Sequence, residues 1–387
     1  MVLFDETTER IDGPADNNED TYNYFHKSSR RDIGIIRDQL EKWFGEYPDV
    51  EKKELKGRFK KDWEPAFYEI FLYSLFRKLG YGVTIHPKVE GSHKRPDFLI
   101  SGKGHKIYVE AKVCYDQSEA ERAFERKRNQ FYDQLNKIRI KGFYLRIVEL
   151  NFTSNKQPNV KDLTKKIEES IASYDPDAIT DQFMKYGFGA CPKIIYEDDD
   201  FNIIIQPMPV DKHKRQKIIE RPIGMFPFET FVGSGEKSLR ESILKKANRY
   251  GRFDVPYLIC INALGKKTSK GDDMENVIWG TLQYTYSTDP RNRNGRMTRK
   301  NDGIFFNGGE MKLRHLSGVL ITKVFSSNIP NASYWLYKNP FASNPLKLGA
   351  FDPGLNYVNN ENLIISAEGA NLDELLDIPK DWLTGKK

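Results

Sequence analysis

The chain has 387 residues, of which 39% are hydrophobic, and a formal net charge of +6. This length suits one large domain or two ordinary ones. No apolar run approaches the roughly 18 residues that would suggest a transmembrane helix, and the N-terminus lacks the basic and apolar regions of a signal peptide. The three cysteines are widely spaced and indicate neither a disulfide framework nor a zinc site. We therefore expect a cytoplasmic protein with no membrane contact, and the mild basicity is weak support for a polyanionic partner.

The N-terminal part contains three predicted segments. Residues 1–28 are polar and acidic, and we expect them to form a mobile tail. Residues 29–58 are predicted to hold a helix, over Arg31–Phe44, and the start of a charged connector, Lys52–Lys61.

A second helix is predicted over Glu64–Leu79, with Pro65 near its first turn. It is apolar nearly all round and should be buried, yet it carries Glu69. A buried carboxylate is costly unless it is paired or binds a metal ion. The alternative to a functional role is a glutamate bonded to a nearby backbone group or arginine. The acidic residues that follow closely in the sequence favour a functional role.

The stretch Arg95–Val113 predicts two strands joined by a glycine-containing turn at residues 101–104. Side chains alternate along a strand, so Glu110 and Lys112 share one face. The opposite face carries four apolar side chains: Ile107, Val109, Ala111 and Val113. If the strands form a hairpin, Asp97 lies beside Glu110. Two carboxylates and an ammonium group would then converge, which can hold a divalent cation and position a water molecule.

The following residues continue the α/β pattern with a capped helix, Ser118–Ile140, a strand, Phe143–Phe152, and a helix, Val160–Ala172. The predicted fold class is therefore an α/β sandwich with a mixed sheet. We assign residues 59–175 to this core and residues 176–387 to a C-terminal α/β extension that can continue the same sheet. The extension has predicted strands over Phe201–Met208, Val255–Leu264, Gly318–Phe325 and Ser333–Tyr337 and predicted helices over Ser238–Tyr250 and Met274–Tyr284.

These residues resemble the PD-(D/E)XK nuclease superfamily, the restriction-endonuclease-like fold. Pro96-Asp97 matches the first half of its motif, and Glu110-Ala111-Lys112 matches the second half on an apolar strand. Glu69 fits the acidic residue that often precedes the motif on the first helix. The resemblance covers roughly residues 60–155 and implies an αβββαβ core. The region after residue 175 matches no family that we can name.

The resemblance implies a Mg²⁺- or Mn²⁺-dependent endonuclease that cuts DNA phosphodiester bonds, with a role in bacterial defence or DNA processing. Asp97 and Glu110 would be metal ligands, and Glu69 would complete or orient the metal shell. Lys112 would bond the attacking water and offset the negative charge of the transition state. The alternative for Glu110 and Lys112 is an amphipathic strand with a solvated polar face.

Supporting residues are also expected. Members of the superfamily often carry a Gln or Tyr on the helix after the third strand, and the candidates here are Gln130, Tyr132 and Gln134. Two basic runs are candidates for nucleic-acid contacts. Their residues are Lys212, Lys214 and Arg215 in the first run and Arg291, Arg293, Arg296, Arg299 and Lys300 in the second. For each run, the alternative is a solvated loop.

Other functions stay open. The chain could be a nucleic-acid-binding module with an idle site, a scaffold in a complex, or a nuclease acting on RNA, since no residue reads a 2′-hydroxyl or a B-form groove. A homo-oligomer is a further expectation. No phosphate-binding GxxxxGK[ST] loop is present, so any NTPase or targeting function would have to come from a partner protein.

Overall fold

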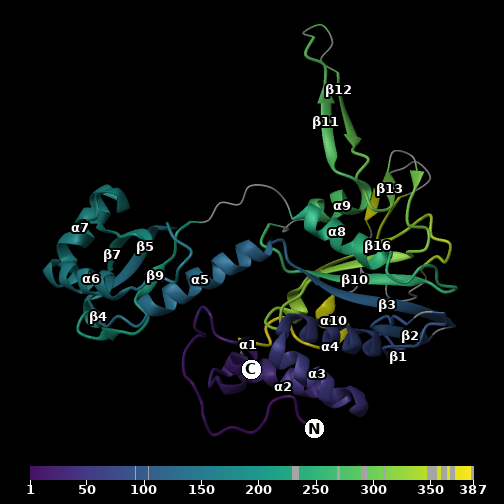
Figure 1. Cartoon of the computed structure of the whole chain (residues 1–387), viewed down its shortest axis with the longest axis horizontal. Helices are drawn as coiled ribbons and strands as arrows, with labels where there is room; N and C mark the ends of the chain where they lie inside the picture. The colour runs from purple at the N-terminus through teal and green to yellow at the C-terminus, as the bar shows by residue number, and fades with distance from the viewer. Residues whose placement is uncertain are drawn as a thin grey trace. The chain divides into compact units, whose positions relative to one another are not determined.

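The computed structural model describes residues 1–91, 93–102, 104–228, 235–267, 271–289, 291, 294–307, 310–346, 355–358, 364–366 and 371–384. The chain divides into two compact units. Unit 1 comprises Met1–Gly13, Thr21–Asp116 and Gly233–Lys387, and unit 2 comprises Pro14–Asp20 and Gln117–Val232. Unit 2 is therefore mainly a long insertion into the chain of unit 1 (Figure 1).

Unit 1 is built on a mixed sheet with the strand order β1-β2-β3-β10-β15-β16-β17-β18. The pairs β3/β10, β10/β15 and β16/β17 are parallel, and the other neighbours are antiparallel. The strands are β1 (Gly82–Ile85), β2 (Phe98–Gly102), β3 (His105–Cys114), β10 (Tyr257–Ala263), β15 (Gly318–Lys323), β16 (Ser333–Lys338), β17 (Leu355–Val358) and β18 (Ile364–Ser366). The α/β class with a mixed sheet is confirmed, and so is the expectation that C-terminal strands continue the first sheet.

Helices lie on both faces of this sheet. They are α1 (Thr21–Lys27), α2 (Arg31–Glu46), α3 (Asp49–Lys61), α4 (Trp63–Lys78), α8 (Glu236–Ala247), α9 (Gly271–Trp279), α10 (Leu372–Leu376) and the short 3₁₀ helix η3 (Ile329–Asn331). Figure 1 shows α8 and α9 on one face and α4 on the other. Every side chain of α4 from Ala66 to Phe76 is buried, as its apolar sequence predicts.

The predicted hairpin is present. Phe98 of β2 pairs with Val109 of β3 in an antiparallel register. Val109 is fully buried, whereas Tyr108 packs on the opposite face with the cluster formed by α8 and α9. The two faces of β3 therefore meet different helices, so the side-chain alternation read from the sequence holds.

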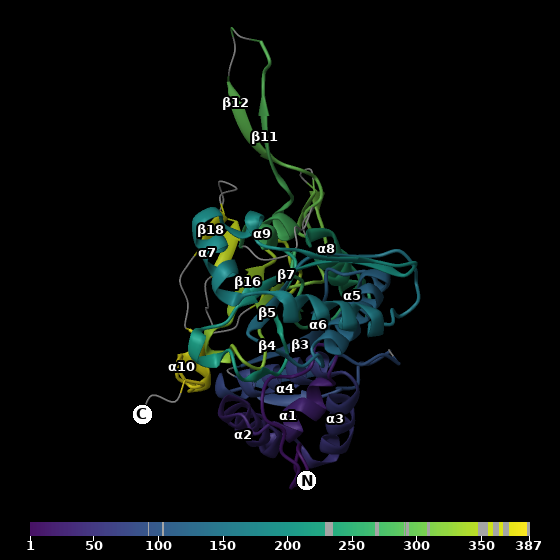
Figure 2. The same ribbon diagram turned by 90° about the vertical axis from the view of Figure 1, so that its left-hand side faces the viewer.

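Two small ribbons also belong to unit 1. The first pairs β11 (Leu282–Tyr286) with β12 (Gly295–Arg299), and the second pairs β13 (Phe306–Asn307) with β14 (Glu310–Met311). Figures 1 and 2 show that the first ribbon projects away from the rest of unit 1.

Unit 2 has its own four-stranded sheet with the order β6-β7-β5-β9 and its own apolar core. Its strands are β4 (Ile140–Lys141), β5 (Phe143–Phe152), β6 (Ile194–Glu197), β7 (Phe201–Pro209), β8 (Ile218–Ile219) and β9 (Ile223–Met225). Its helices are α5 (Glu119–Leu135), α6 (Lys161–Ser173), α7 (Pro176–Tyr186), η1 (Phe188–Ala190) and η2 (Lys212–Lys214). The predicted capping box of α5 is formed by Ser118 and Glu121.

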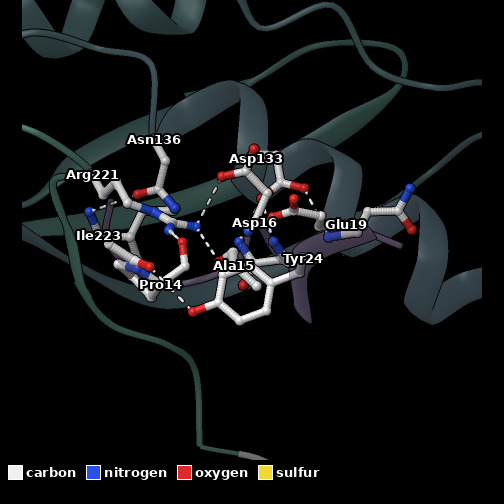
Figure 3. A network of polar contacts seen from close by, with 12 residues as sticks. Pro14, Ala15, Asp16, Glu19, Tyr24, Asp133, Asn136, Arg221 and Ile223 are labelled. Atoms are coloured by element: carbon white, nitrogen blue, oxygen red, sulfur yellow. Dashed lines mark hydrogen bonds and ion pairs between the residues drawn. The ribbon is translucent and has the colours of Figure 1, made fainter. Parts of the chain in front are cut away.

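A segment from the N-terminal region completes unit 2 (Figure 3). Arg221 donates hydrogen bonds to the carbonyl oxygens of Pro14 and Ala15, and Asp133 accepts from the backbone of Asn17 at 2.7 Å. These are polar contacts between residues far apart in sequence, so residues 14–20 are held in place.

The prediction of a mobile acidic tail over residues 1–28 is therefore wrong. Leu3 is fully buried, and the ring of Phe25 in α1 lies 4.5 Å from that of Trp63. Two of the acidic side chains form ion pairs within unit 1, Asp5 with Lys56 and Glu9 with Lys27. Composition misled here because a few aromatic residues between the acids supply enough apolar surface to pack.

Two element predictions are also corrected. The charged connector Lys52–Lys61 is part of helix α3, since Leu55 and Phe59 are one turn apart and bury a narrow apolar stripe. The predicted helix Met274–Tyr284 ends at Trp279, where Gly280 takes a positive φ of 97°, and the chain continues as β11.

The predicted domain boundaries differ from those of the two units. The helix and strand expected to follow β3 in the first sheet, α5 and β5, lie in unit 2. In the large sheet, β10 is the parallel neighbour of β3, and α8 precedes it in the chain. Periodicity identifies strands but not their partners, so the insertion was invisible in the sequence.

Candidate functional site

The hairpin brings Asp97 and Glu110 together, as the sequence predicts. Asp97 directly precedes β2, and the register that pairs Phe98 with Val109 sets it beside Glu110. Its Oδ2 accepts a hydrogen bond from the backbone N–H of Ala111 at 2.6 Å. No described residue donates a hydrogen bond to the other oxygen, Oδ1.

The surroundings of Asp97 favour its protonated form. Burial raises the pKa of Asp97 to about 6, and the nearby charge of Glu110 contributes in the same direction. The N–H of Ala111 and the ammonium group of Lys246 oppose this rise in pKa. A cation placed between the two neighbouring carboxylates would reduce their mutual repulsion.

Glu110 is 1% exposed, and its carboxylate is bound by three donors from the last turn of α8 and the residues just after it. Lys246 forms an ion pair with Oε1, and Arg249 reaches the same oxygen at 3.2 Å. The hydroxyl of Tyr250 donates to Oε2 at 2.5 Å. Burial and this hydrogen bond raise the pKa of Tyr250, so the phenol keeps its proton. The negative charge of Glu110 is thus balanced without any bound ion.

A pocket of about 720 Å³ opens next to these donors. Its lining residues are Lys94, Lys112, Ser242, Lys245, Lys246, Asn248 and Arg249. Five of the seven are basic and none is acidic. Lys112 is exposed at this pocket, two residues after Glu110 on the same strand. Such a concentration of positive charge attracts a polyanion.

Glu69 has the environment that the sequence left open as an alternative to a catalytic role. It is 4% exposed, and Arg58 of α3 binds both of its carboxylate oxygens through two guanidinium nitrogens. The hydroxyl of Tyr47 donates to Oε1 at 2.5 Å. Glu69 is close enough to Asp97 to raise the pKa of Asp97, but its contribution is smaller than that of Glu110.

The three carboxylates do not form one metal centre. Within the described ranges, no three His, Cys, Asp or Glu side chains are grouped so that they could hold a metal ion. Of the three predicted ligands, the structure brings Asp97 and Glu110 together and does not group Glu69 with them as a third ligand. Mg²⁺ is often bound by one or two carboxylates together with water and substrate phosphates, so a pair of carboxylates is chemically adequate.

The predicted supporting residues lie on α5, in unit 2, whereas the four site residues lie in unit 1. Tyr132 is buried in the core of unit 2, where its ring lies 4.8 Å from that of Phe226. Gln130 is exposed, and Gln134 is half-buried. The prediction followed the order of helices in the sequence, but the helix that packs on the Glu110 face of the site strand is α8.

The first predicted basic run lies in unit 2, at η2. Arg215 forms two hydrogen bonds of 3.0 Å with the carboxylate of Asp177, and Lys212 pairs with the same group at 3.3 Å. Lys214 is exposed. Part of this positive charge is thus balanced inside the unit.

The second run lies on the β11/β12 ribbon. Arg291 pairs with Asp289 at 3.2 Å, and Arg299 is held at the base of the ribbon by Glu275. Arg296 and Lys300 are exposed. Arg293 lies outside the described residues. These contacts neither test nor exclude nucleic-acid binding by the two runs.

Sequence reasoning missed the donors at the end of α8. Lys246 lies in the last turn of α8, and Arg249 and Tyr250 follow shortly after its end at Ala247. These closely spaced polar residues were visible as a signal. The sequence did not show that these side chains bind Glu110, because Lys246 and Glu110 are 136 residues apart.

No protein-family model, curated protein or solved structure matches the chain. Among the described helices, none is both long and apolar enough to cross a membrane.

Proposed function

We propose that this protein is a metal-dependent nuclease that hydrolyses DNA phosphodiester bonds, with Asp97, Glu110 and Lys112 as its catalytic residues. One observation carries the proposal. A buried glutamate, Glu110, and a half-buried aspartate, Asp97, lie beside a pocket in which all five charged lining residues are positive. Hydrolysis of a phosphodiester needs both features, because anionic substrate must be attracted and a metal-bound water must be held.

The order of elements supports a restriction-endonuclease-like core. Without unit 2, unit 1 reads α4, β1, β2, β3, α8 and β10, which is a helix, three strands, a helix and a strand. Pro96-Asp97 directly precedes β2, and Glu110-Ala111-Lys112 lies on β3, which is the order that the superfamily resemblance implies. The insertion between β3 and α8 explains why the sequence pattern alone suggested a different helix and strand.

The donor set fits a hard cation. Asp97 offers Oδ1, and Glu110 offers a carboxylate that would have to exchange its α8 donors for the ion. A bound Mg²⁺ or Mn²⁺ would supply an activated water and offset phosphate charge. Lys112 would bond that water or a phosphate oxygen, and Lys94 and Lys245, which line the same pocket, would bind the substrate backbone.

A second candidate follows from the contacts of Glu110. Because Lys246, Arg249 and Tyr250 already satisfy this carboxylate, the site could bind nucleic acid and remain catalytically idle. RNA as substrate, a cytoplasmic location, a homo-oligomer or partner protein, and a role in bacterial defence or DNA processing stay predictions.

A cleavage assay tests the proposal. Plasmid, linear duplex, single-stranded DNA and RNA are incubated with Mg²⁺ or Mn²⁺, with EDTA as a control. We expect DNA cutting that EDTA stops, and a loss of about 100-fold or more in rate for Asp97→Ala and for Lys112→Ala. The matched control is Lys237→Ala, which removes a lysine of α8 that is 86% exposed and does not line the pocket; it should cut at the wild-type rate.

Cutting that survives both site variants would contradict the assigned residues. Salt-sensitive binding by folded protein without any cutting would favour the idle binding module. Cutting confined to RNA would keep the site and change the substrate.

A further inference from the structure

We propose that the β11/β12 ribbon is an arm that binds unpaired bases of a nucleic acid. This proposal rests on the proposed function, which supplies the nucleic acid as the binding partner. It concerns residues that the catalytic site does not use. The ribbon is a two-stranded antiparallel sheet, and all five side chains of β11 are exposed. An isolated two-stranded ribbon is only marginally stable in water, so a surface of this kind gains stability when a partner covers it.

One face of the ribbon is aromatic. Tyr284 and Tyr286 alternate with polar residues on β11, so their rings share a side, where they stack with centroids 6.0 Å apart. The rings remain 58% and 64% exposed. Met297, opposite Tyr284, adds an exposed apolar side chain to the same face. We call Tyr284, Tyr286 and Met297 the aromatic platform.

Gly295 makes the platform possible. It lies opposite Tyr286, and a β-carbon at this position would lie 1.6 Å from the hydroxyl oxygen of Tyr284. The Tyr284 ring therefore extends across Gly295, where any other residue would displace it. A glycine in a strand often marks such a close approach.

The charge of the ribbon favours a nucleic acid over a second copy of the chain. Residues 291–300 contain five Lys or Arg and no Asp or Glu. Arg296 is exposed on the face opposite the platform, since it pairs with Thr285. Two such ribbons would repel each other, whereas a phosphate backbone would be attracted.

The aromatic rings favour unpaired bases over a duplex. Tyrosine rings bind bases by stacking, and stacking needs a free base face. In a duplex the base faces are covered by their neighbours. An exposed aromatic platform next to like positive charges is the combination used by proteins that bind single strands.

Fluorescence anisotropy with the full-length protein tests this inference. The probes are a labelled oligodeoxythymidine and a labelled duplex, both in EDTA so that cleavage plays no part. We expect Tyr284→Ala and Tyr286→Ala each to weaken single-strand binding by roughly tenfold and duplex binding far less. Gly295→Val, which displaces the Tyr284 ring, should reproduce the loss. Arg296→Gln should reduce the salt dependence of binding by about one phosphate contact.

The matched control is Tyr186→Ala, on α7 of unit 2, because this tyrosine is also 64% exposed. It should bind the single strand like the wild type. Unchanged single-strand binding in both ribbon variants would overturn the inference, as would an equal loss for single strand and duplex. A fall in the molecular mass of the protein in solution, seen only in the ribbon variants, would assign the platform to a second copy instead. None of these outcomes depends on whether the wild type cuts DNA.

Discussion

Glu69 and Glu110 are two buried glutamates in unit 1 with similar partners and different surroundings. Each is less than 5% exposed, and each accepts a hydrogen bond from a tyrosine hydroxyl and binds cationic side chains. For Glu69 the cation is one arginine, Arg58, which binds both carboxylate oxygens. For Glu110 the cations are Lys246 and Arg249, and both line the pocket.

The difference shows that burial and satisfied hydrogen bonds do not distinguish a structural carboxylate from a functional one. The two-pronged pair of Glu69 and Arg58 joins α4 to α3 in a fixed geometry. Glu110 instead has a second carboxylate, Asp97, as its neighbour, and its cations face a pocket that can admit phosphate groups. We therefore infer that the partners of Glu110 are exchangeable and those of Glu69 are not.

Stability measurements should give the largest contrast between the two glutamates. Glu69→Gln leaves the Arg58 guanidinium with only Glu54, 3.9 Å away, as a counter-charge. We expect it to lower the free energy of unfolding by about 2 kcal/mol, less than for a fully buried pair because Arg58 is partly exposed. Glu110→Gln relieves repulsion with Asp97 and leaves cations that water can reach, so we expect a change below about 1 kcal/mol.

Urea unfolding followed by tryptophan fluorescence measures these changes for unit 1 alone, because all five tryptophans belong to that unit. Arg58→Lys should recover only part of the loss when compared with Arg58→Ala, since lysine cannot bind both oxygens. Equal losses for Glu69→Gln and Glu110→Gln would show that the two glutamates have the same structural role.

The pH dependence of stability should distinguish the carboxylate pair Asp97 and Glu110 from the ion pair of Glu69 and Arg58. In the folded protein the pKa of Asp97 is raised from 3.8 to about 6, so between these values the folded state keeps a proton that the unfolded state releases. The unfolding free energy must therefore fall as the pH rises through this window, by about 3 kcal/mol from this group. Below it, Asp97 is protonated in both states and contributes no difference.

Asp97→Asn should remove this slope and should be more stable than the wild type at neutral pH when EDTA is present. The measurement is urea unfolding at several pH values, with Glu241→Gln as control because this α8 side chain is 66% exposed. A stability difference between Asp97→Asn and the wild type that does not change with pH would refute the raised pKa.

How much of this arrangement the sequence could predict depends on how local each feature is. The alternation of β3 and the Pro-Asp start of β2 are local, and they placed Asp97 beside Glu110 correctly. The limits of β5 were also predicted as found. In contrast, the packing of the N-terminal residues against Trp63 depends on a few aromatic side chains in a polar segment, which an average over composition conceals.

The missing part of the site is non-local. Nothing in β3 indicates that its parallel neighbour is β10, or that unit 2 separates the two strands in the chain. Without that pairing, the basic residues at the end of α8 could not be assigned to Glu110. The sequence identified Glu69 as buried. Whether it binds Arg58 or a metal ion could be decided only from the position of α3.

The smallest expected effect tests whether the cations of Glu110 are exchangeable. A metal ion that binds Glu110 must displace Lys246, so we expect Lys246→Gln to raise Mn²⁺ affinity about tenfold in titration calorimetry without nucleic acid. Lys245→Gln is the matched control, since it removes the same charge from the same pocket and none of the described contacts joins Lys245 to Glu110. A smaller gain for the control would isolate the direct contact from the general charge of the pocket. Equal gains would mean that Lys246 acts only through its charge, and the distinction between the two glutamates would then rest on Asp97.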